Sequence, residues 1–248
     1  MMKIKNSLKK FLGIHNSTLT VGKNNETTRN QWIISTLGKL PSGLRILDVG
    51  AGEKPYEDYC THLDYISQDF GKYNPNDVNF GLQVDDWNYG KLDIISDIAS
   101  IPVADNSFDA ILCTEVLEHV INPKEAIKEF SRILKSGGYL IITTPFCSLT
   151  HFAPYHFYSG FSRFFYETVL KNNYYDIEVT SNGNYFEYLA QEINRLEYTG
   201  KKYSNVELTK NERKRMRTVN LLLERLSKQD SGSDELLCFG YFILARRK

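Results

Sequence analysis

The residues whose types and spacing could do chemistry begin at a glycine pair. An apolar run from Leu44 to Val49 carries one acid, Asp48, and continues directly into Gly50-Ala51-Gly52. Glycine allows φ > 0 and has no Cβ, so the ribose and the carboxylate-bearing tail of a ligand can lie directly on the backbone of such a turn. The pattern predicts a strand followed by a nucleoside-binding turn. If no other motif accompanied this glycine pair, an ordinary tight turn would be the alternative interpretation.

Further acids end the following apolar segments. The segment from Leu63 to Gln68 runs into Asp69, where the second strand of a βαβ unit should finish, and a carboxylate there can accept both ribose hydroxyls. The segment Leu92–Ile98 carries Asp97 near its end. Residues 108–113 indicate a buried fourth strand.

More motifs follow in order: Asp105–Asp109, Glu115–Val120, Arg132–Gly138 and Thr144–Pro145. With the glycine turn, they resemble the class I S-adenosylmethionine-dependent methyltransferases, the type 11 group in particular, over residues 44 to about 145. A dinucleotide dehydrogenase is the nearest rival. Its fingerprint needs a third glycine where this chain has Pro55, which argues against NAD.

The resemblance implies S-adenosyl-L-methionine as the cofactor and assigns its contacts. The methionine moiety would lie on the glycine turn, the ribose on Asp69, and the adenine on Asp97 and the Ile98 amide. Asp48 could instead cap the turn, and Asp97 could simply end a strand. Residues at the end of the fourth strand should face the reacting methyl. The candidate cofactor-binding set is Asp48, Gly50, Ala51, Gly52, Asp69, Asp97, Ile98, Thr114 and Glu115.

A run rich in histidine and aromatic residues follows the predicted fifth strand, Tyr139–Thr144. A hydroxyl acceptor has to lose its proton as the methyl arrives, and histidine is the usual base near pH 7. The alternatives are an aromatic clamp that seats the next helix and, for His119, a histidine packed against backbone. The candidate catalytic residues are His151, His156, Glu115 and His119.

The same run is similar to one in bacterial methyltransferases encoded among surface-polysaccharide enzymes. This resemblance implies O-methylation of a sugar or another small metabolite, whose ring the aromatic side chains could stack on. The sequence shows no carboxylate cluster of the kind that magnesium-dependent O-methyltransferases use, so no metal is expected. A non-catalytic scaffold or binding protein with this fold is the alternative, although the intact donor residues favour an enzyme.

The amino-acid composition limits the classes of partner that we expect for this chain. The 248 residues include 30 basic and 30 acidic side chains, so no net positive charge would hold the chain on nucleic acid. The four cysteines lack metal-ligand spacing and the N-terminus lacks a signal-peptide core, which favours the cytoplasm. Segment 1–26 is polar and basic, and lysines alternate there with apolar residues as in a helix on a membrane surface. A frayed terminus is the alternative.

Together the segments predict an α/β fold over residues 27–248, Rossmann-like and doubly wound, with a mostly parallel seven-stranded sheet and an antiparallel last strand. Helices are expected at Thr27–Leu40, after the cap at Asn122, and near Phe161–Leu170. A helical insertion over about 184–230 precedes the last strand. We expect it to cover the acceptor or to join two copies in a homodimer, with core padding as the alternative.

Overall fold

The computed structural model describes residues 19–248, so the basic N-terminal run and the membrane contact expected of it lie outside the described residues. Residues 25–185 and 232–248 form one compact unit, and residues 19–24 and 186–231 belong to another. Each unit is described below by itself. Among the described residues, no helix has the length and apolar character that a membrane span requires.

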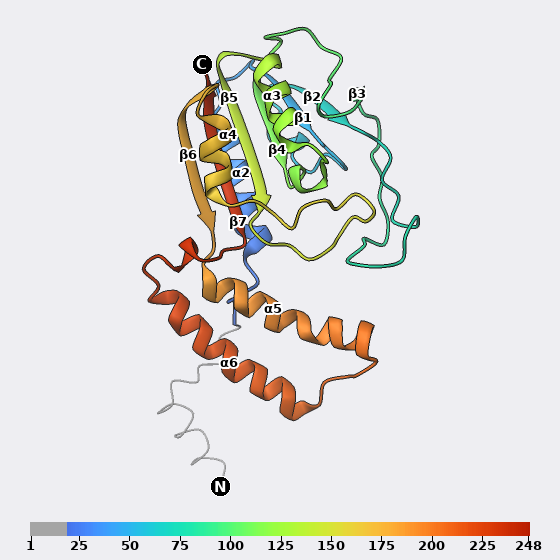
Figure 1. Cartoon of the computed structure of the whole chain (residues 1–248), viewed down its shortest axis with the longest axis vertical. Helices are drawn as coiled ribbons and strands as arrows, with labels where there is room; N and C mark the ends of the chain where they lie inside the picture. Colours follow the sequence, from blue (N-terminus) through green and yellow to red (C-terminus); the bar gives the residue numbers. More distant parts are fainter. Residues whose placement is uncertain (1–18) are drawn as a thin grey trace. The chain divides into compact units, whose positions relative to one another are not determined.

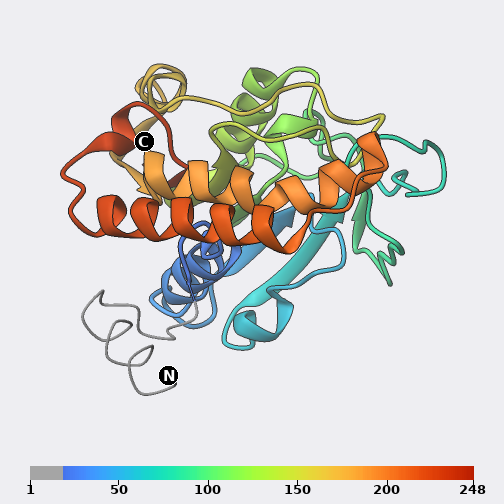
Figure 2. The same cartoon turned by 90° about the horizontal axis from the view of Figure 1, so that it is seen from below.

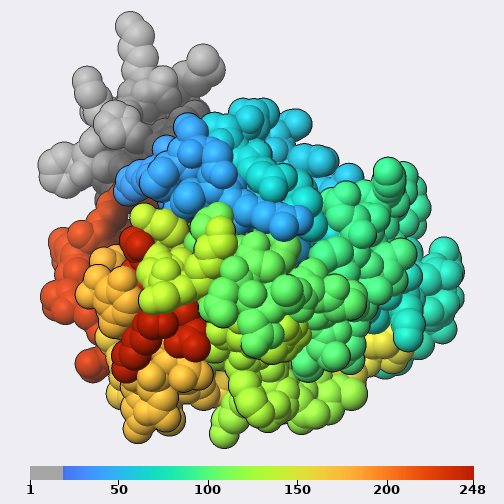
Figure 3. All heavy atoms as spheres, turned by 90° about the horizontal axis from the view of Figure 1, so that it is seen from above, coloured from blue at the N-terminus to red at the C-terminus, as the bar shows by residue number. Residues whose placement is uncertain are grey.

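The larger unit is built on one seven-stranded sheet with the order β3-β2-β1-β4-β5-β7-β6. Strands β1 to β5 pair in parallel, whereas β7 lies between β5 and β6 and is antiparallel to both. Figure 3 shows the end of β7 in red between the yellow-green of β5 and the orange of β6. The predicted fold class is confirmed. The strands are β1 (Arg45–Val49), β2 (Asp64–Asp69), β3 (Ile94–Ile95), β4 (Phe108–Thr114), β5 (Leu134–Pro145), β6 (Tyr174–Asn182) and β7 (Gly240–Arg247).

Helices cover both faces of this sheet, α3 (Pro123–Ile133) and α4 (Arg163–Leu170) on one side and α2 (Asn25–Leu37) on the other (Figure 1). Successive side chains of a strand point to opposite faces. In β4, Ile111 therefore packs in the core under α3 and α4, while Leu112 packs in the core under α2. Because both faces are buried, the strand reads as a continuous apolar run.

The bounds of strands β3 and β5 differ from the sequence prediction. Strand β3 is shorter than the expected Leu92–Ile98 because the Asp93 carboxylate accepts the Ser67 backbone N–H at 2.9 Å, a bond that a ladder carbonyl would otherwise take. Strand β5 begins at Leu134, directly after α3 and earlier than the expected start at Tyr139, so Gly137 and Gly138 lie within it. The register slips there between Phe108 and Ala110, so the glycines belong to a bulge.

The smaller unit contains α5 (Tyr185–Thr199), a π-helical turn at Gly200–Ser204 and α6 (Lys210–Lys228). The two long helices lie side by side (Figures 1 and 2). Val21, Ala190 and Leu223 form its small buried core, and the Asn220 side-chain amide donates to Asn194 Oδ1 at 2.8 Å. The helical insertion thus shares a small core with the segment that precedes α2. Its role over the acceptor or in a homodimer stays a prediction.

Candidate functional site

A cavity of about 720 Å³ opens where the parallel strands end. Segments that follow β1, β2, β3 and β4 contribute to its wall. The volume lies within the range of roughly 300–1,000 Å³ that small-molecule and cofactor sites occupy. Nine of the residues expected from the sequence line it: Gly50, Ala51, Gly52, Asp69, Asp97, Ile98, Thr114, Glu115 and His119.

The turn after β1 requires glycine at both expected positions. Gly50 has φ +69° and Gly52 has φ +54°, in the left-handed region. A Cβ at Gly50 would lie 2.5 Å from a methyl of Val116, and one at Gly52 would lie 2.8 Å from the ring of Trp87. Both neighbours also line the cavity. The turn is therefore a close-fitting backbone cradle that any side chain would fill.

Asp69, at the end of β2, ties this cradle to the next loop. One carboxylate oxygen accepts the Gly52 N–H and the other accepts the Gly71 N–H, each at 3.0 Å. Burial raises the pKa of Asp69, and these backbone N–H groups act in the opposite direction. Each oxygen keeps a second lone pair for a ligand hydroxyl.

Gln68 also supports the cradle, and sequence reasoning missed it. Its side-chain oxygen accepts the Gly50 N–H at 3.4 Å, and its nitrogen donates to the Ser96 carbonyl at 2.7 Å. This buried amide links the turn after β1 to the segment after β3, where Asp97 and Ile98 lie. No motif marks it, because its role depends on strand pairing.

Asp48 does not line the cavity, unlike the other expected donor residues. Its buried carboxylate accepts the Tyr65 hydroxyl at 2.7 Å, and burial raises the pKa of Asp48 to about 7. Within a strand, side chains alternate between faces, and this one points into the sheet packing rather than toward the opening. The structure thus gives Asp48 a supporting position instead of direct contact with a ligand.

Glu115 directly follows β4 and has a left-handed conformation, with φ +54°. Its carboxylate pairs with Arg29 of α2 at 2.9 Å, and both residues line the cavity. Burial acts to lower the pKa of Arg29, but Glu115, Tyr56 and Glu26 together outweigh it, so the pKa of Arg29 is raised. Sequence reasoning missed Arg29, since nothing in the α2 pattern connects it to β4.

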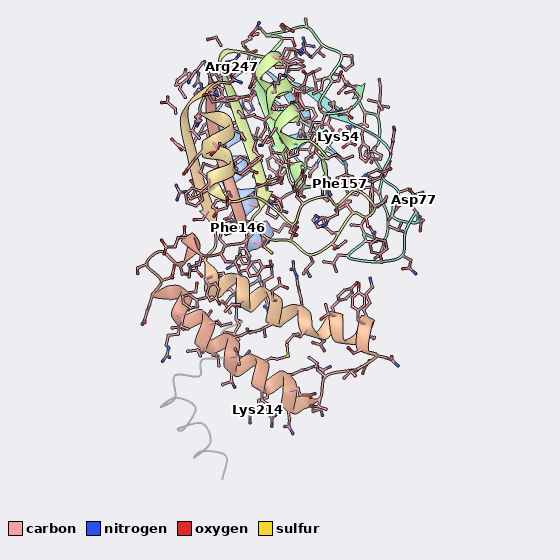
Figure 4. The ribbon with its side chains drawn as sticks, in the orientation of Figure 1. Lys54, Asp77, Phe146, Phe157, Lys214 and Arg247 are labelled. Atoms are coloured by element: carbon pink, nitrogen blue, oxygen red, sulfur yellow. The ribbon has the colours of Figure 1, made fainter. Side chains whose placement is uncertain are left out.

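Aromatic rings from two loops form another part of the wall. Trp87 contacts Tyr73 edge-to-face, with ring centroids 5.6 Å apart, and Phe152 at 5.1 Å. Phe157, on the loop after β5, is marked in Figure 4. The loop between β2 and β3 was not expected to take part, although its aromatic residues amid Asn, Asp and Gly were a signal. The aromatic wall consists of Phe70, Tyr73, Trp87, Tyr89, Phe152, Tyr155 and Phe157.

The three candidate histidines come together, but only His119 of them lines the cavity. The His119 ring centroid lies 4.7 Å from that of His151 and 5.9 Å from that of His156. Burial, together with His151, lowers the pKa of His119 to about 3. Burial also lowers the pKa of His156, whose Nε2 lies 3.2 Å from Ser148 Oγ. His151 and His156 therefore lie behind His119 rather than at the opening.

Residues 47–142 match the family model described as a methyltransferase domain. This segment is a class I methyltransferase domain. Among solved structures, a SAM-dependent methyltransferase from Archaeoglobus fulgidus has the same fold, with a TM-score of 0.51 at 18% identity over 89% of this chain and 92% of that one.

Curated relatives of the methyltransferase domain include two enzymes of quinone metabolism by name. A demethylmenaquinone methyltransferase of Renibacterium salmoninarum is 32% identical over 140 residues, covering 52% of this chain and 52% of that protein. A ubiquinone biosynthesis O-methyltransferase of Xanthomonas axonopodis pv. citri is 31% identical over 111 residues, covering 42% of this chain and 44% of that protein. The chain spans about half the length of the curated relatives it matches.

Proposed function

We propose that this chain is an S-adenosylmethionine-dependent methyltransferase that methylates a hydroxyl group on a small ring-containing metabolite. The observation that carries the proposal is the glycine cradle held by the Asp69 carboxylate at the edge of a cavity of about 720 Å³. The family match falls on the same residues, from 47 onward.

The polar side chains of the cavity wall suit a nucleoside without phosphates. Asp69 and Asp97 offer carboxylates, which accept from hydroxyl and amino groups and would repel a pyrophosphate. Pro55 lines the cavity at the place where a dinucleotide site needs its third glycine. The Arg29 guanidinium supplies positive charge for the carboxylate of a methionine moiety.

S-adenosylmethionine supplies, when bound, a methyl group on a sulfonium that is its own leaving group. The chain then has to bind both reactants, align them and exclude water. The strained backbone at Glu115 and its ion pair with Arg29 fix the wall beside the cradle. Such rigid positioning is what an in-line displacement demands.

The aromatic wall supports a ring as the acceptor. Its side chains can stack on a planar ring or on the apolar face of a sugar. The names of the two quinone-related relatives agree with a planar acceptor. A sugar is the second class of acceptor that we propose. Because His119 borders the cavity and His151 and His156 do not, direct proton removal by either of the latter two gains no support from their positions.

The test begins with donor binding to the full chain. Calorimetry should detect S-adenosylmethionine and S-adenosylhomocysteine but not NAD, and no heat at millimolar donor would overturn the proposal. A methyl-labelled donor should then be incubated with two acceptor sets, hydroxylated aromatic compounds and monosaccharides, and products identified by mass spectrometry. Labelling in one set fixes the acceptor class. Donor binding without labelling of any acceptor would favour the scaffold alternative.

A further inference from the structure

The side chain of Glu118 is fully buried in the short helix Leu117–His119 that follows β4. Neither carboxylate oxygen makes a hydrogen bond to another residue within 19–248. A buried carboxylate without a partner is costly, and native proteins seldom keep one without a reason. Glu118 is also absent from the cavity wall, so the proposed donor and acceptor contacts do not account for it.

Two histidines converge on this carboxylate. His119 Nε2 lies 3.8 Å from Glu118 Oε1, and His151 Nε2 lies 4.0 Å from the same oxygen. One ligand atom from each of the three residues lies within 4.8 Å of the others. The residues come from two segments, the turn after β4 and the loop after β5, so only the tertiary fold assembles them.

The hydrogen bonds of both rings define which nitrogen carries the proton. His119 Nδ1 lies 2.6 Å from the Tyr155 carbonyl, and His151 Nδ1 lies 2.8 Å from the Leu149 carbonyl. A carbonyl oxygen only accepts, so each Nδ1 must donate and each neutral ring has its lone pair on Nε2. Metal-binding histidines are held in this way, with the second nitrogen donating to backbone.

We propose that Glu118, His119 and His151 form a binding site for a divalent transition-metal ion of the zinc type. Two imidazoles and one carboxylate are a known donor set for such ions, whereas Mg²⁺ prefers oxygen ligands. Tetrahedral zinc with bonds of about 2.0–2.2 Å places its ligand atoms about 3.3–3.6 Å apart. The three atoms would therefore approach one another by roughly 0.2–1.5 Å, which small rotations of the side chains can supply.

The site would connect to the cavity through His119, which belongs to both. A three-ligand ion keeps open positions, and a hydroxyl bound there has a lowered pKa. This consequence for the acceptor rests on the proposed function, whereas metal binding itself does not. No metal was expected from the sequence, which lacks a carboxylate cluster and cysteines with metal-ligand spacing. A mixed site assembled from separate segments has no spacing signature.

Metal binding is tested on the untagged full chain after treatment with a chelator. Calorimetry with Zn²⁺ should give one high-affinity site per chain, and Co²⁺ should give visible absorption bands of a nitrogen- and oxygen-ligated ion. Glu118→Gln and His151→Ala should each weaken Zn²⁺ binding by roughly tenfold or more. His156→Ala is the matched control, because His156 adjoins the cluster but lies outside the ligand set, and it should bind Zn²⁺ like the wild type.

Two outcomes would overturn the metal site: no Zn²⁺ binding to the wild type, or equal binding by wild type, Glu118→Gln and His151→Ala. Glu118→Gln keeps the shape of the side chain and removes its charge, so it should fold, as thermal unfolding would verify. Calorimetry with S-adenosylhomocysteine on the same proteins separates the two proposals. Donor binding that persists without Zn²⁺ binding refutes the metal site alone, and Zn²⁺ binding without donor binding refutes the proposed function alone.

Discussion

Replacement of Asp69 tests whether the carboxylate at the end of β2 holds the donor ribose. Each of its oxygens accepts one backbone N–H at 3.0 Å. Alanine would remove both bonds, each worth about 1.5–3 kcal/mol to a charged acceptor, and would leave buried N–H groups unpaired. Asparagine keeps one acceptor oxygen and should cost about half as much. Asp69→Asn is therefore the variant in which the fold should persist.

The effect on the donor follows from the same bonds. A hydrogen bond to a neutral acceptor is worth about 0.5–1.5 kcal/mol instead of about 1.5–3 kcal/mol. Two ribose hydroxyls would thus lose a total of about 2–3 kcal/mol in Asp69→Asn. Binding of S-adenosylhomocysteine should weaken by roughly 30- to 150-fold.

The assay compares S-adenosylhomocysteine with its 2′,3′-dideoxy analogue by calorimetry. The wild type should prefer the natural ligand, and Asp69→Asn should lose most of this preference. Asp48→Asn serves as the control, because Asp48 is buried but does not line the cavity and its replacement should leave the preference intact. A folded Asp69→Asn protein that discriminates as the wild type does would refute the ribose assignment.

Three further predictions concern the cradle and its surroundings. Gly50→Ala should lower the free energy of unfolding by about 2–5 kcal/mol in urea titrations, from left-handed strain and overlap with Val116, and adding Val116→Ala should recover about 1–3 kcal/mol. If adding Val116→Ala recovers no stability, overlap with Val116 is not the cause of the loss. Burial raises the pKa of Asp48 from 3.8 to about 7, so the folded chain binds more protons between these values and stability is lost as pH rises through 7. Asp48→Asn should remove this decline in the free energy of unfolding, which is on the order of 4 kcal/mol. If the variant and the wild type lose stability equally as pH rises, the decline does not come from Asp48. Trp87 contacts the cradle, and Trp32 of α2 is the other of the two tryptophans in the sequence. Donor binding should therefore change tryptophan fluorescence in the wild type and in Trp32→Phe but not in Trp87→Phe. A donor response that survives in Trp87→Phe would place the donor elsewhere.

The parts of the site that sequence predicted are local. Gly50 and Gly52 follow β1 directly, and Asp69 ends β2, so strand periodicity and turn chemistry place them at one sheet edge. The alternation of apolar segments also predicted the parallel sheet and its antiparallel last strand. The bounds of β3 were predicted less well, because the Asp93 carboxylate accepts a backbone N–H of β2 that would otherwise bond to a strand carbonyl.

The remaining features depend on contacts between distant segments. Arg29 reaches Glu115 across 86 positions of the chain, and His151 meets Glu118 because the loop after β5 folds back over the turn after β4. No local preference encodes such distances. Sequence by itself predicted a glycine turn after β1 and an acid near the end of each of the next two strands. Tertiary structure alone decided that Asp48 lies inside the sheet packing, that aromatic loops form the cavity wall and that two histidines face a buried glutamate, because loop conformations are set by packing against the rest of the fold.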